Sequence, residues 1–224
     1  MPTTHGNVSP EREARAMNIG ILGSGEVAKS LAAGFIGRGD AVMLGTRDPD
    51  KLAADVQEGV RVGSFAQAAQ FDEVVVVATN GTAVEDALEL AGADNFNSKV
   101  VIDVTNPLDS STGKLRLTWG FDDSNGERVQ QALPAAKVVK AFNTVGHALF
   151  VHPDLPGGPP SMFVAGDDDG AKQTVAKILA DFGWECIDAG DIESSRYLEP
   201  MCVLWIDYGL RTQNWTHAFK LLHR

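Results

Sequence analysis

NIGILGSGEVAKSLA, which runs from Asn18 to Ala32, is the stretch of sequence that decides the fold. Its apolar start is typical of a buried strand, and its second half has the pattern of an amphipathic helix. Between them, GSGEVA matches the dinucleotide-binding pattern G-x-G-x-x-A. Gly23 permits the tight turn, Gly25 leaves room for a pyrophosphate, and Ala28 lets the helix pack close to the sheet. The stretch predicts a βαβ unit that binds a dinucleotide at the N-terminus of its helix.

The alternation of strands and helices continues to about residue 150. Further strands are expected at residues 40–46, 60–62, 73–80, 99–107 and 136–144. Helices are expected at residues 26–38, 48–57, 65–70, 81–92 and 126–134. Apolar runs such as VVVVA are typical of strands buried on both faces of a parallel sheet. The chain is predicted to be an α/β protein with a Rossmann-type, doubly wound, mainly parallel sheet.

Three segments are expected along the chain. They are a polar N-terminal arm (residues 1–16), a nucleotide-binding Rossmann core (17–150) and a short α/β C-terminal extension packed on the same domain (151–224). In the extension we expect strands at 160–166 and 184–190, a helix at 168–182, and a mostly helical end at 193–222. The acidic run Asp167–Asp169 lacks the spacing of a calcium loop and is expected to stabilise the start of the helix that it precedes.

Composition limits the classes of function. The net charge of −11 repels nucleic acid and anionic lipid, so we expect small-molecule partners, no nucleic acid and no membrane. The longest apolar runs are far shorter than the roughly 20 residues of a membrane span. The polar start lacks the apolar centre of a signal peptide, so a cytoplasmic location is expected. Cys186 and Cys202 have apolar neighbours and are expected to be buried thiols rather than a disulfide.

Arg47 indicates which dinucleotide is bound. An acidic residue about 20 positions after the glycine motif normally binds the ribose 2′-hydroxyl and repels a 2′-phosphate, but here that place holds Thr46 and Arg47. A guanidinium can bind a phosphate through two parallel hydrogen bonds, and Lys51 can add a second positive charge. NADP(H) is therefore predicted as the cofactor. The alternative is that Arg47 forms a surface salt bridge with Asp48 or Asp50.

Polar residues also follow the later strands of the predicted sheet. Thr79 and Asn80 end one strand, Asn106 and Pro107 end the next, and KAFNTVG ends the last. Ligands of such sheets bind outside the carboxyl ends of the strands, so these residues are expected to line a groove beside the nicotinamide. No Ser/His/Asp triad and no metal-binding pattern is legible, and no catalytic residue is assigned. Hydride transfer between two ring cofactors needs none, because orientation and proximity carry most of the catalysis.

Several blocks of the sequence resemble the coenzyme F420-dependent NADP reductase family, which includes the oxidoreductase domain of the STEAP metalloreductases. They are NIGILGSGEVAKSLA, GTRDP, VIDVTNP, VVKAFNTVG, VAGDDDGAK and IDAGDIESSRYLEP, and they cover roughly 200 residues. The resemblance implies a homodimer, NADP(H) along the Rossmann edge, and an acceptor stacked on the nicotinamide under the C-terminal region.

The resemblance also implies roles for single residues. Ser24, Gly25, Glu26 and Val27 would hold the pyrophosphate, Thr46 and Arg47 the 2′-phosphate, and Ala141 the carboxamide, while Asn143, Thr144 and Val145 would border the acceptor. Archaeal deazaflavin enzymes have a histidine where this chain has Asn143. The form KAFNT is closer to the STEAP pattern, whose acceptor is a flavin.

Two hypotheses from different classes follow. The first is an NADP(H)-dependent oxidoreductase that transfers hydride between NADPH and F420 or a flavin such as FMN or FAD. The second is a non-catalytic NADP(H)-binding redox sensor, and reduction of a small carbonyl, imine or ferric substrate is a further alternative.

Overall fold

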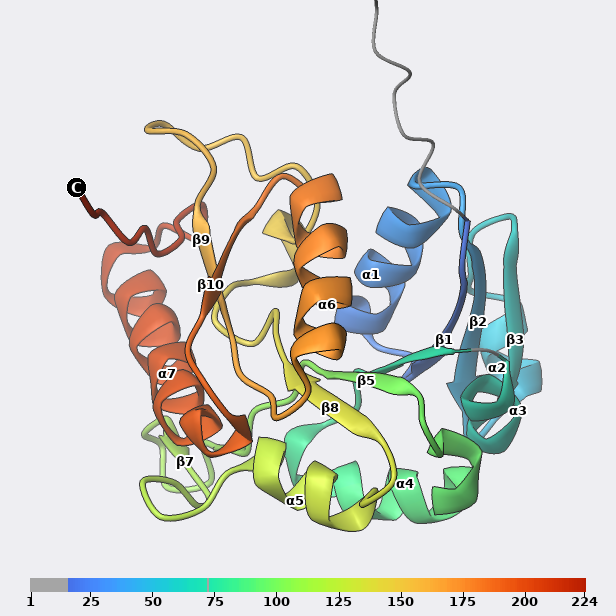
Figure 1. The fold of residues 1–224 in the computed structure, drawn as a ribbon. Helices are drawn as coiled ribbons and strands as arrows, with labels where there is room; N and C mark the ends of the chain where they lie inside the picture. Colours follow the sequence, from blue (N-terminus) through green and yellow to red (C-terminus); the bar gives the residue numbers. More distant parts are fainter. Residues whose placement is uncertain (1–15, 72) are drawn as a thin grey trace, which may run out of the picture.

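A six-stranded parallel sheet forms the centre of the computed structural model, which describes residues 16–71 and 73–224 (Figure 1). Its strands are β1 (Asn18–Leu22), β2 (Ala41–Thr46), β3 (Val60–Ser64), β4 (Val74–Val77), β5 (Val100–Asp103) and β8 (Lys137–Lys140). Their order in space is β3-β2-β1-β4-β5-β8, and every neighbouring pair is parallel. The order reverses beside β1, which confirms the doubly wound sheet expected from the sequence.

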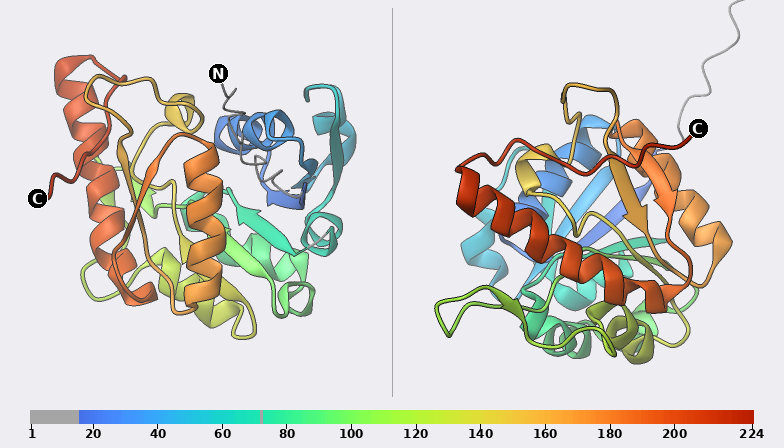
Figure 2. Two further views of the ribbon diagram at one scale, coloured as in Figure 1. Left: turned by 45° about the horizontal axis from the view of Figure 1, so that its top comes forward. Right: turned by 90° about the vertical axis from the view of Figure 1, so that its left-hand side faces the viewer.

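Helices cover both faces of this sheet (Figures 1 and 2). The α-helices are α1 (Glu26–Gly37), α2 (Pro49–Ala53), α3 (Phe65–Gln70), α4 (Val84–Ala91), α5 (Asn125–Ala132), α6 (Asp169–Asp181) and α7 (Ser195–Thr212). Short 3₁₀ turns are η1 (Gly81–Ala83), η2 (Ala93–Phe96), η3 (His147–Leu149) and η4 (Ile192–Ser194). Helices α1 and α6 pack on one face, and α3, α4 and α5 on the other.

Alternation along the central strands explains the two cores. Val74 and Val76 of β4 point into the cluster that contains α1 and α6, whereas Val75 and Val77 point into the cluster that contains α3, α4 and α5. All four side chains are buried. A strand with helices on both sides needs apolar residues at every position, which is why VVVV is continuous rather than alternating.

The C-terminal extension adds two strands, β9 (Ser161–Val164) and β10 (Glu185–Asp188), which form a parallel pair. Helix α6 lies between them in the sequence. A single antiparallel bridge between Lys140 and Ala165 connects this small sheet with β8. Ile178 and Phe182 pack in the same cluster as α1 of the Rossmann core. Asp168 caps α6 by accepting the N–H of Ala171, which confirms the expected role of the acidic run.

The structure corrects several expectations about the elements. The expected strands 73–80 and 99–107 end at Val77 and Asp103, and the expected helix 48–57 ends at Ala53. The expected strand 136–144 ends at Lys140, because the chain turns at Phe142, where φ is +59°. The loop after β5 contains an antiparallel hairpin of β6 (Leu108–Asp109) and β7 (Arg116–Leu117), which two-residue strands give no pattern to predict. The expected helical end 193–222 is helical only to Thr212, after which the tail crosses β9 in extended form (Figure 2).

Two further expectations concern the N-terminal arm and membrane-spanning helices. Of the predicted polar arm, only Ala16 lies within the described residues. Within those residues no helix is both long and apolar enough to cross a membrane.

Candidate active site

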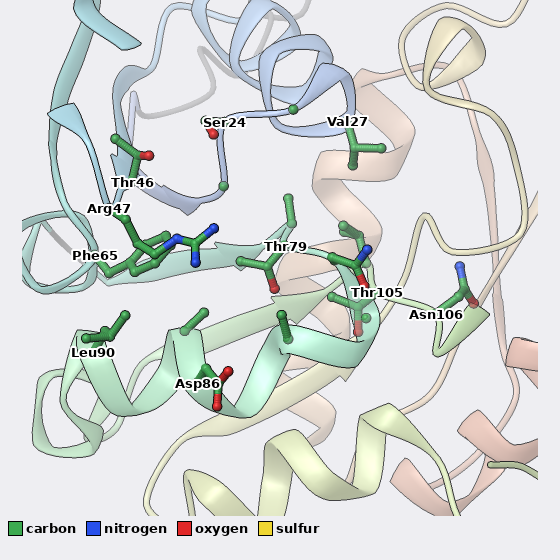
Figure 3. A pocket seen from close by; sticks show the side chains of 18 of the residues that line it. Ser24, Val27, Thr46, Arg47, Phe65, Thr79, Asp86, Leu90, Thr105 and Asn106 are labelled. Carbon is green, nitrogen blue, oxygen red and sulfur yellow. The ribbon is translucent and has the colours of Figure 1, made fainter. Parts of the chain in front are cut away.

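A cleft of about 870 Å³ opens at the carboxyl ends of β1, β2, β4 and β5 (Figure 3). Many of the residues singled out in the sequence line it: Gly23, Ser24, Gly25, Glu26, Val27, Thr46, Arg47, Thr79, Asn80 and Asn106. The cleft therefore brings together the glycine motif, the end of β2 and the ends of the next two strands. Strand order explains the placement, because β1 lies between β2 and β4.

The glycine motif forms one wall of the cleft, and its two glycines have different roles. Gly23 has a φ of +143°, and a Cβ there would lie 2.4 Å from the carbonyl oxygen of Ala78, so the turn itself requires glycine. A Cβ on Gly25 would meet no described atom within 4 Å, and it would project into open space. No side chain of the described residues caps α1. Its N-terminal N–H groups and this open space fit a pyrophosphate group.

Arg47 lies just beyond β2, and Figure 3 shows its side chain beside Phe65 and directed into the cleft. None of the described carboxylates lies within ion-pair distance of its guanidinium, so the structure does not contain the alternative salt bridge with Asp48 or Asp50. Asp48 instead caps α2 by accepting the N–H of Lys51. The guanidinium is thus free to receive an anion at the position expected for the 2′-phosphate.

Four of the predicted site residues do not line the cleft. Lys51 is exposed on α2, while Pro107, Ala141 and Asn143 are buried beyond the strand ends. Thr144 and Val145, which the resemblance places beside the acceptor, are buried as well. These assignments remain predictions.

Asn143 nevertheless holds a residue that lines the cleft. Its Nδ2 donates to Oδ1 of Asn106 at 3.0 Å, and its backbone oxygen accepts from Nδ2 of Asn106 at 2.9 Å. Nδ2 of Asn143 also donates to the carbonyl oxygen of Leu198 in α7 at 3.0 Å. The carboxamides of Asn106 and Asn143 are therefore fixed together at the end of the cleft next to the C-terminal extension.

Several residues that line the cleft were not predicted from the sequence. Phe65 follows Ser64, the last residue of β3, and Thr105 precedes Asn106 in the VTNP block. Both follow the rule that was applied to the other strand ends, so that signal was present. Asp86, Glu89 and Leu90 come from α4, whose cleft-facing side no sequence pattern distinguishes from its exposed side.

A buried cluster of charges lies directly behind the cleft. The ammonium group of Lys140 is fully buried and lies 2.6 Å from Oδ2 of Asp103, 2.7 Å from Oε1 of Glu199 and 2.8 Å from the carbonyl oxygen of Thr105. Burial disfavours the charge on Lys140, but the two carboxylates outweigh it and raise the pKa of the ammonium group. Burial also raises the pKa of the Glu199 carboxyl group, against the opposing effect of Lys140. We call Lys140, Asp103 and Glu199 the buried triad.

The described part of the chain contains no group of three or more His, Cys, Asp or Glu side chains that could hold a metal ion. Cys202 is buried and Cys186 half-buried, and both are free thiols. The prediction of two buried thiols is thus correct for Cys202 and too strong for Cys186.

Comparison with known proteins agrees with the geometry. A family described as "NADP oxidoreductase coenzyme F420-dependent" matches residues 18–107. Metalloreductase STEAP3 of Rattus norvegicus is 33% identical over 184 residues, which are 82% of this chain but 36% of that protein, so the chain spans little more than a third of it. The F420-dependent NADP reductase of Methanothermobacter marburgensis is 27% identical over 88% of this chain and 94% of that protein.

A solved structure extends the similarity to three dimensions. A proposed F420-dependent NADP reductase from Arthrobacter sp. FB24 is 36% identical and superposes with a TM-score of 0.87 over 92% of this chain and 99% of that one. These similarities cover nearly the whole chain and confirm the prediction of an NADP-dependent oxidoreductase. The chain belongs to the coenzyme F420-dependent NADP oxidoreductase family.

Proposed function

We propose that the protein transfers hydride between NADPH and a flavin-type acceptor, either the deazaflavin F420 or FMN or FAD. The observation that carries this proposal is Arg47, whose guanidinium reaches into the cleft without a carboxylate partner among the described residues. A cofactor without a 2′-phosphate would leave this charge unused, whereas NADPH pairs with it.

The cleft supports an extended cofactor. Arg47 and Thr46 would bind the 2′-phosphate, and the N-terminus of α1 would bind the pyrophosphate. The ribose and nicotinamide would then lie past Thr79 and Asn80 toward Asn106. The bound cofactor supplies the hydride, and the part of the protein is to hold it, orient it and exclude water. Reduction of a flavin-type ring takes this hydride and one proton and leaves NADP⁺.

The acceptor would lie where Asn106 and Asn143 meet α7. The asparagine at position 143, in place of the histidine of archaeal deazaflavin enzymes, favours a flavin. The similarity to STEAP3, a metalloreductase by name, adds ferric iron as a further candidate for the electrons.

We further propose that the protein acts in the cytoplasm, and that it forms the homodimer that the family resemblance implies. Exposed apolar side chains on one side of α7 support the dimer: Tyr197 and Leu204 are 69% and 55% exposed, and Tyr208 is 43% exposed. Residues at this spacing share one face of a helix, and such a face is typical of an interface.

Anaerobic oxidation of NADPH by the purified protein tests the function. F420, FMN, FAD and ferric citrate would be offered in separate reactions, with NADH in place of NADPH as the control. Rapid oxidation with FMN or FAD alone is the expected result, and oxidation with F420 alone would assign the deazaflavin. Tight binding of NADPH without turnover in any reaction would contradict the proposal and favour the redox sensor.

A further inference from the structure

Glu199 joins three elements of the fold from a fully buried position. Its Oε1 accepts from the ammonium group of Lys140 in β8 at 2.7 Å and from the N–H of Gly126 at 3.1 Å, and its Oε2 accepts from the N–H of Asn125 at 3.1 Å. The last two N–H groups belong to the first turn of α5, where a carboxylate is also favoured by the helix dipole. One side chain of α7 thus fixes that helix to β8 and to α5.

The contacts of the buried triad continue into the cleft. Asp103 accepts from the N–H and the hydroxyl group of Thr105 at 2.9 and 2.7 Å. Nδ2 of Asn125 donates to the same hydroxyl oxygen at 2.8 Å and to the carbonyl oxygen of Gly81 at 2.9 Å. Both Thr105 and Gly81 line the cleft. The residue before Glu199 is Leu198, whose carbonyl oxygen holds Asn143 and, through it, Asn106.

Stability alone does not explain the triad. Burying charges costs several kcal/mol for each ion, and well-packed apolar residues in place of a buried ion pair are often neutral or stabilising. The adjacent cores consist of apolar residues, mainly valine, leucine, isoleucine, alanine and phenylalanine, which pack at this depth without that cost. What charged and hydrogen-bonded groups add is a defined geometry, because each ammonium hydrogen has one acceptor at a fixed place.

We propose that Glu199 is a positioning residue for hydride transfer. It acts through Leu198 and Asn143 on Asn106, at the nicotinamide end of the cleft. This inference rests on the proposed function. It predicts that changes at Glu199 affect the nicotinamide half of the cofactor and leave the adenosine half unaffected, since no hydrogen bond or ion pair of the triad involves Arg47 or the glycine motif.

The test compares Glu199→Gln with wild type and with Glu193→Gln. Glutamine keeps the size of the side chain, but its amide nitrogen would face an N–H donor whichever way it points, so at least one contact is lost. Glu193 is the matched control, because it forms an ion pair with Arg196 at 2.9 Å on the surface and does not contact the triad. The probes are 2′,5′-ADP, which carries only the adenosine half, NADPH, followed by its fluorescence, and turnover with F420 and FMN.

For Glu199→Gln we expect turnover to fall about tenfold to a hundredfold, because small misplacements of a reacting group have effects of that size. The dissociation constant of 2′,5′-ADP should change less than about twofold, and Glu193→Gln should match wild type in every measurement. Equal weakening of 2′,5′-ADP and NADPH together with a lower melting temperature would show a purely structural role and overturn the proposal. A variant indistinguishable from Glu193→Gln would overturn it too.

Asn143→Ala supplies the second variant, which breaks the contact with Leu198 and leaves the buried charges in place. Because Glu199 is proposed to act through Asn143, adding Glu199→Gln to Asn143→Ala should lower turnover by less than about threefold. Additive losses would contradict the route through Asn143. If Glu199→Gln does not fold, Asn143→Ala alone must show lower turnover at unchanged affinity for 2′,5′-ADP. If the wild-type protein did not bind NADPH or did not turn over, the proposed function itself would be wrong. A loss confined to the variants concerns only the role of Glu199.

Discussion

The backbone N–H of Lys51 donates a hydrogen bond to the carboxylate of Asp48, with the two atoms 3.2 Å apart, so Asp48 serves as the cap of α2 and not as the partner of Arg47. Asp48 is the neighbour of Arg47 in the sequence, and a salt bridge between them would have explained the arginine without a ligand. Because that carboxylate faces the helix, the positive charge at the end of β2 remains available to the cleft.

Arg47→Ala is therefore expected to weaken NADPH binding by roughly tenfold to a hundredfold, which corresponds to the 1.5 to 3 kcal/mol of a typical charge-assisted contact. NADH binding should change little, because it lacks the 2′-phosphate. Lys51→Ala, on the exposed side of α2, should have the smaller effect. Titration of each variant with both cofactors makes the comparison, and equal losses for NADPH and NADH would contradict the assignment.

The two glycines of the motif should respond differently to alanine. At Gly25 the backbone has φ −84° and the space around a Cβ is open, so Gly25→Ala should fold normally. The methyl group would, however, occupy the space proposed for the pyrophosphate, and such overpacking costs about 1–3 kcal/mol, or about fivefold to somewhat over a hundredfold in affinity for NADPH. Thermal unfolding and NADPH titration separate the two properties.

Gly23→Ala is the matched comparison. Its methyl group would meet the carbonyl oxygen of Ala78, and its φ of +143° is strained for alanine, so the free energy of unfolding should fall by more than about 1 kcal/mol. A stable Gly23→Ala protein, or a Gly25→Ala protein with the NADPH affinity of wild type, would show that the glycines do not divide the work in this way.

The parts of the fold that the sequence predicted are those set by local pattern. The β1–turn–α1 unit needs Gly23 at one strained position, and β4 needs apolar residues on both faces, so each leaves a signature within a few residues. The contact between Lys140 and Glu199 leaves none, because it depends on how α7 packs after the extension has folded back. Lys140 was accordingly interpreted only as part of a strand.

At the end of the chain, beyond Thr212, the sequence predicts a helix that the structure does not contain. The mixture of aromatic and aliphatic residues in this segment resembles an amphipathic helix, but α7 ends at Thr212, and Gln213 has the left-handed conformation that terminates a helix. The carbonyl oxygen of Phe219 accepts from the N–H of Ser161 instead, beside β9. An available strand edge outweighed the local preference, and a pattern within one segment cannot report an edge elsewhere in the chain.

The β6–β7 hairpin gives a prediction about pH. Asp109 accepts hydrogen bonds from Ser111 and from Arg116, and these contacts lower the pKa of its carboxyl group to about 2. A carboxyl group whose pKa is lowered by folding stabilises the hairpin above its ordinary pKa near 4, and this contribution is lost as the pH falls toward 2. Titration followed by NMR should give the low pKa, and Arg116→Gln should raise it. A pKa near 4 in the wild-type protein would show that the hairpin contacts do not persist in solution.

The tail should stabilise the extension by covering Trp205. This indole is 6% exposed, donates its N–H to the carbonyl oxygen of His217 at 2.8 Å, and stacks on the imidazole ring with centroids 4.6 Å apart. Removal of residues 213–224 uncovers the ring, which should cost about 2 kcal/mol and shift its fluorescence emission to longer wavelength. Leu222→Ala is the control within the tail, because Leu222 is 83% exposed and its truncation should leave both the melting temperature and the emission unchanged. If the truncated protein kept both properties as well, the tail would not pack on Trp205 in solution, and the cover over this end of α7 would have to come from elsewhere.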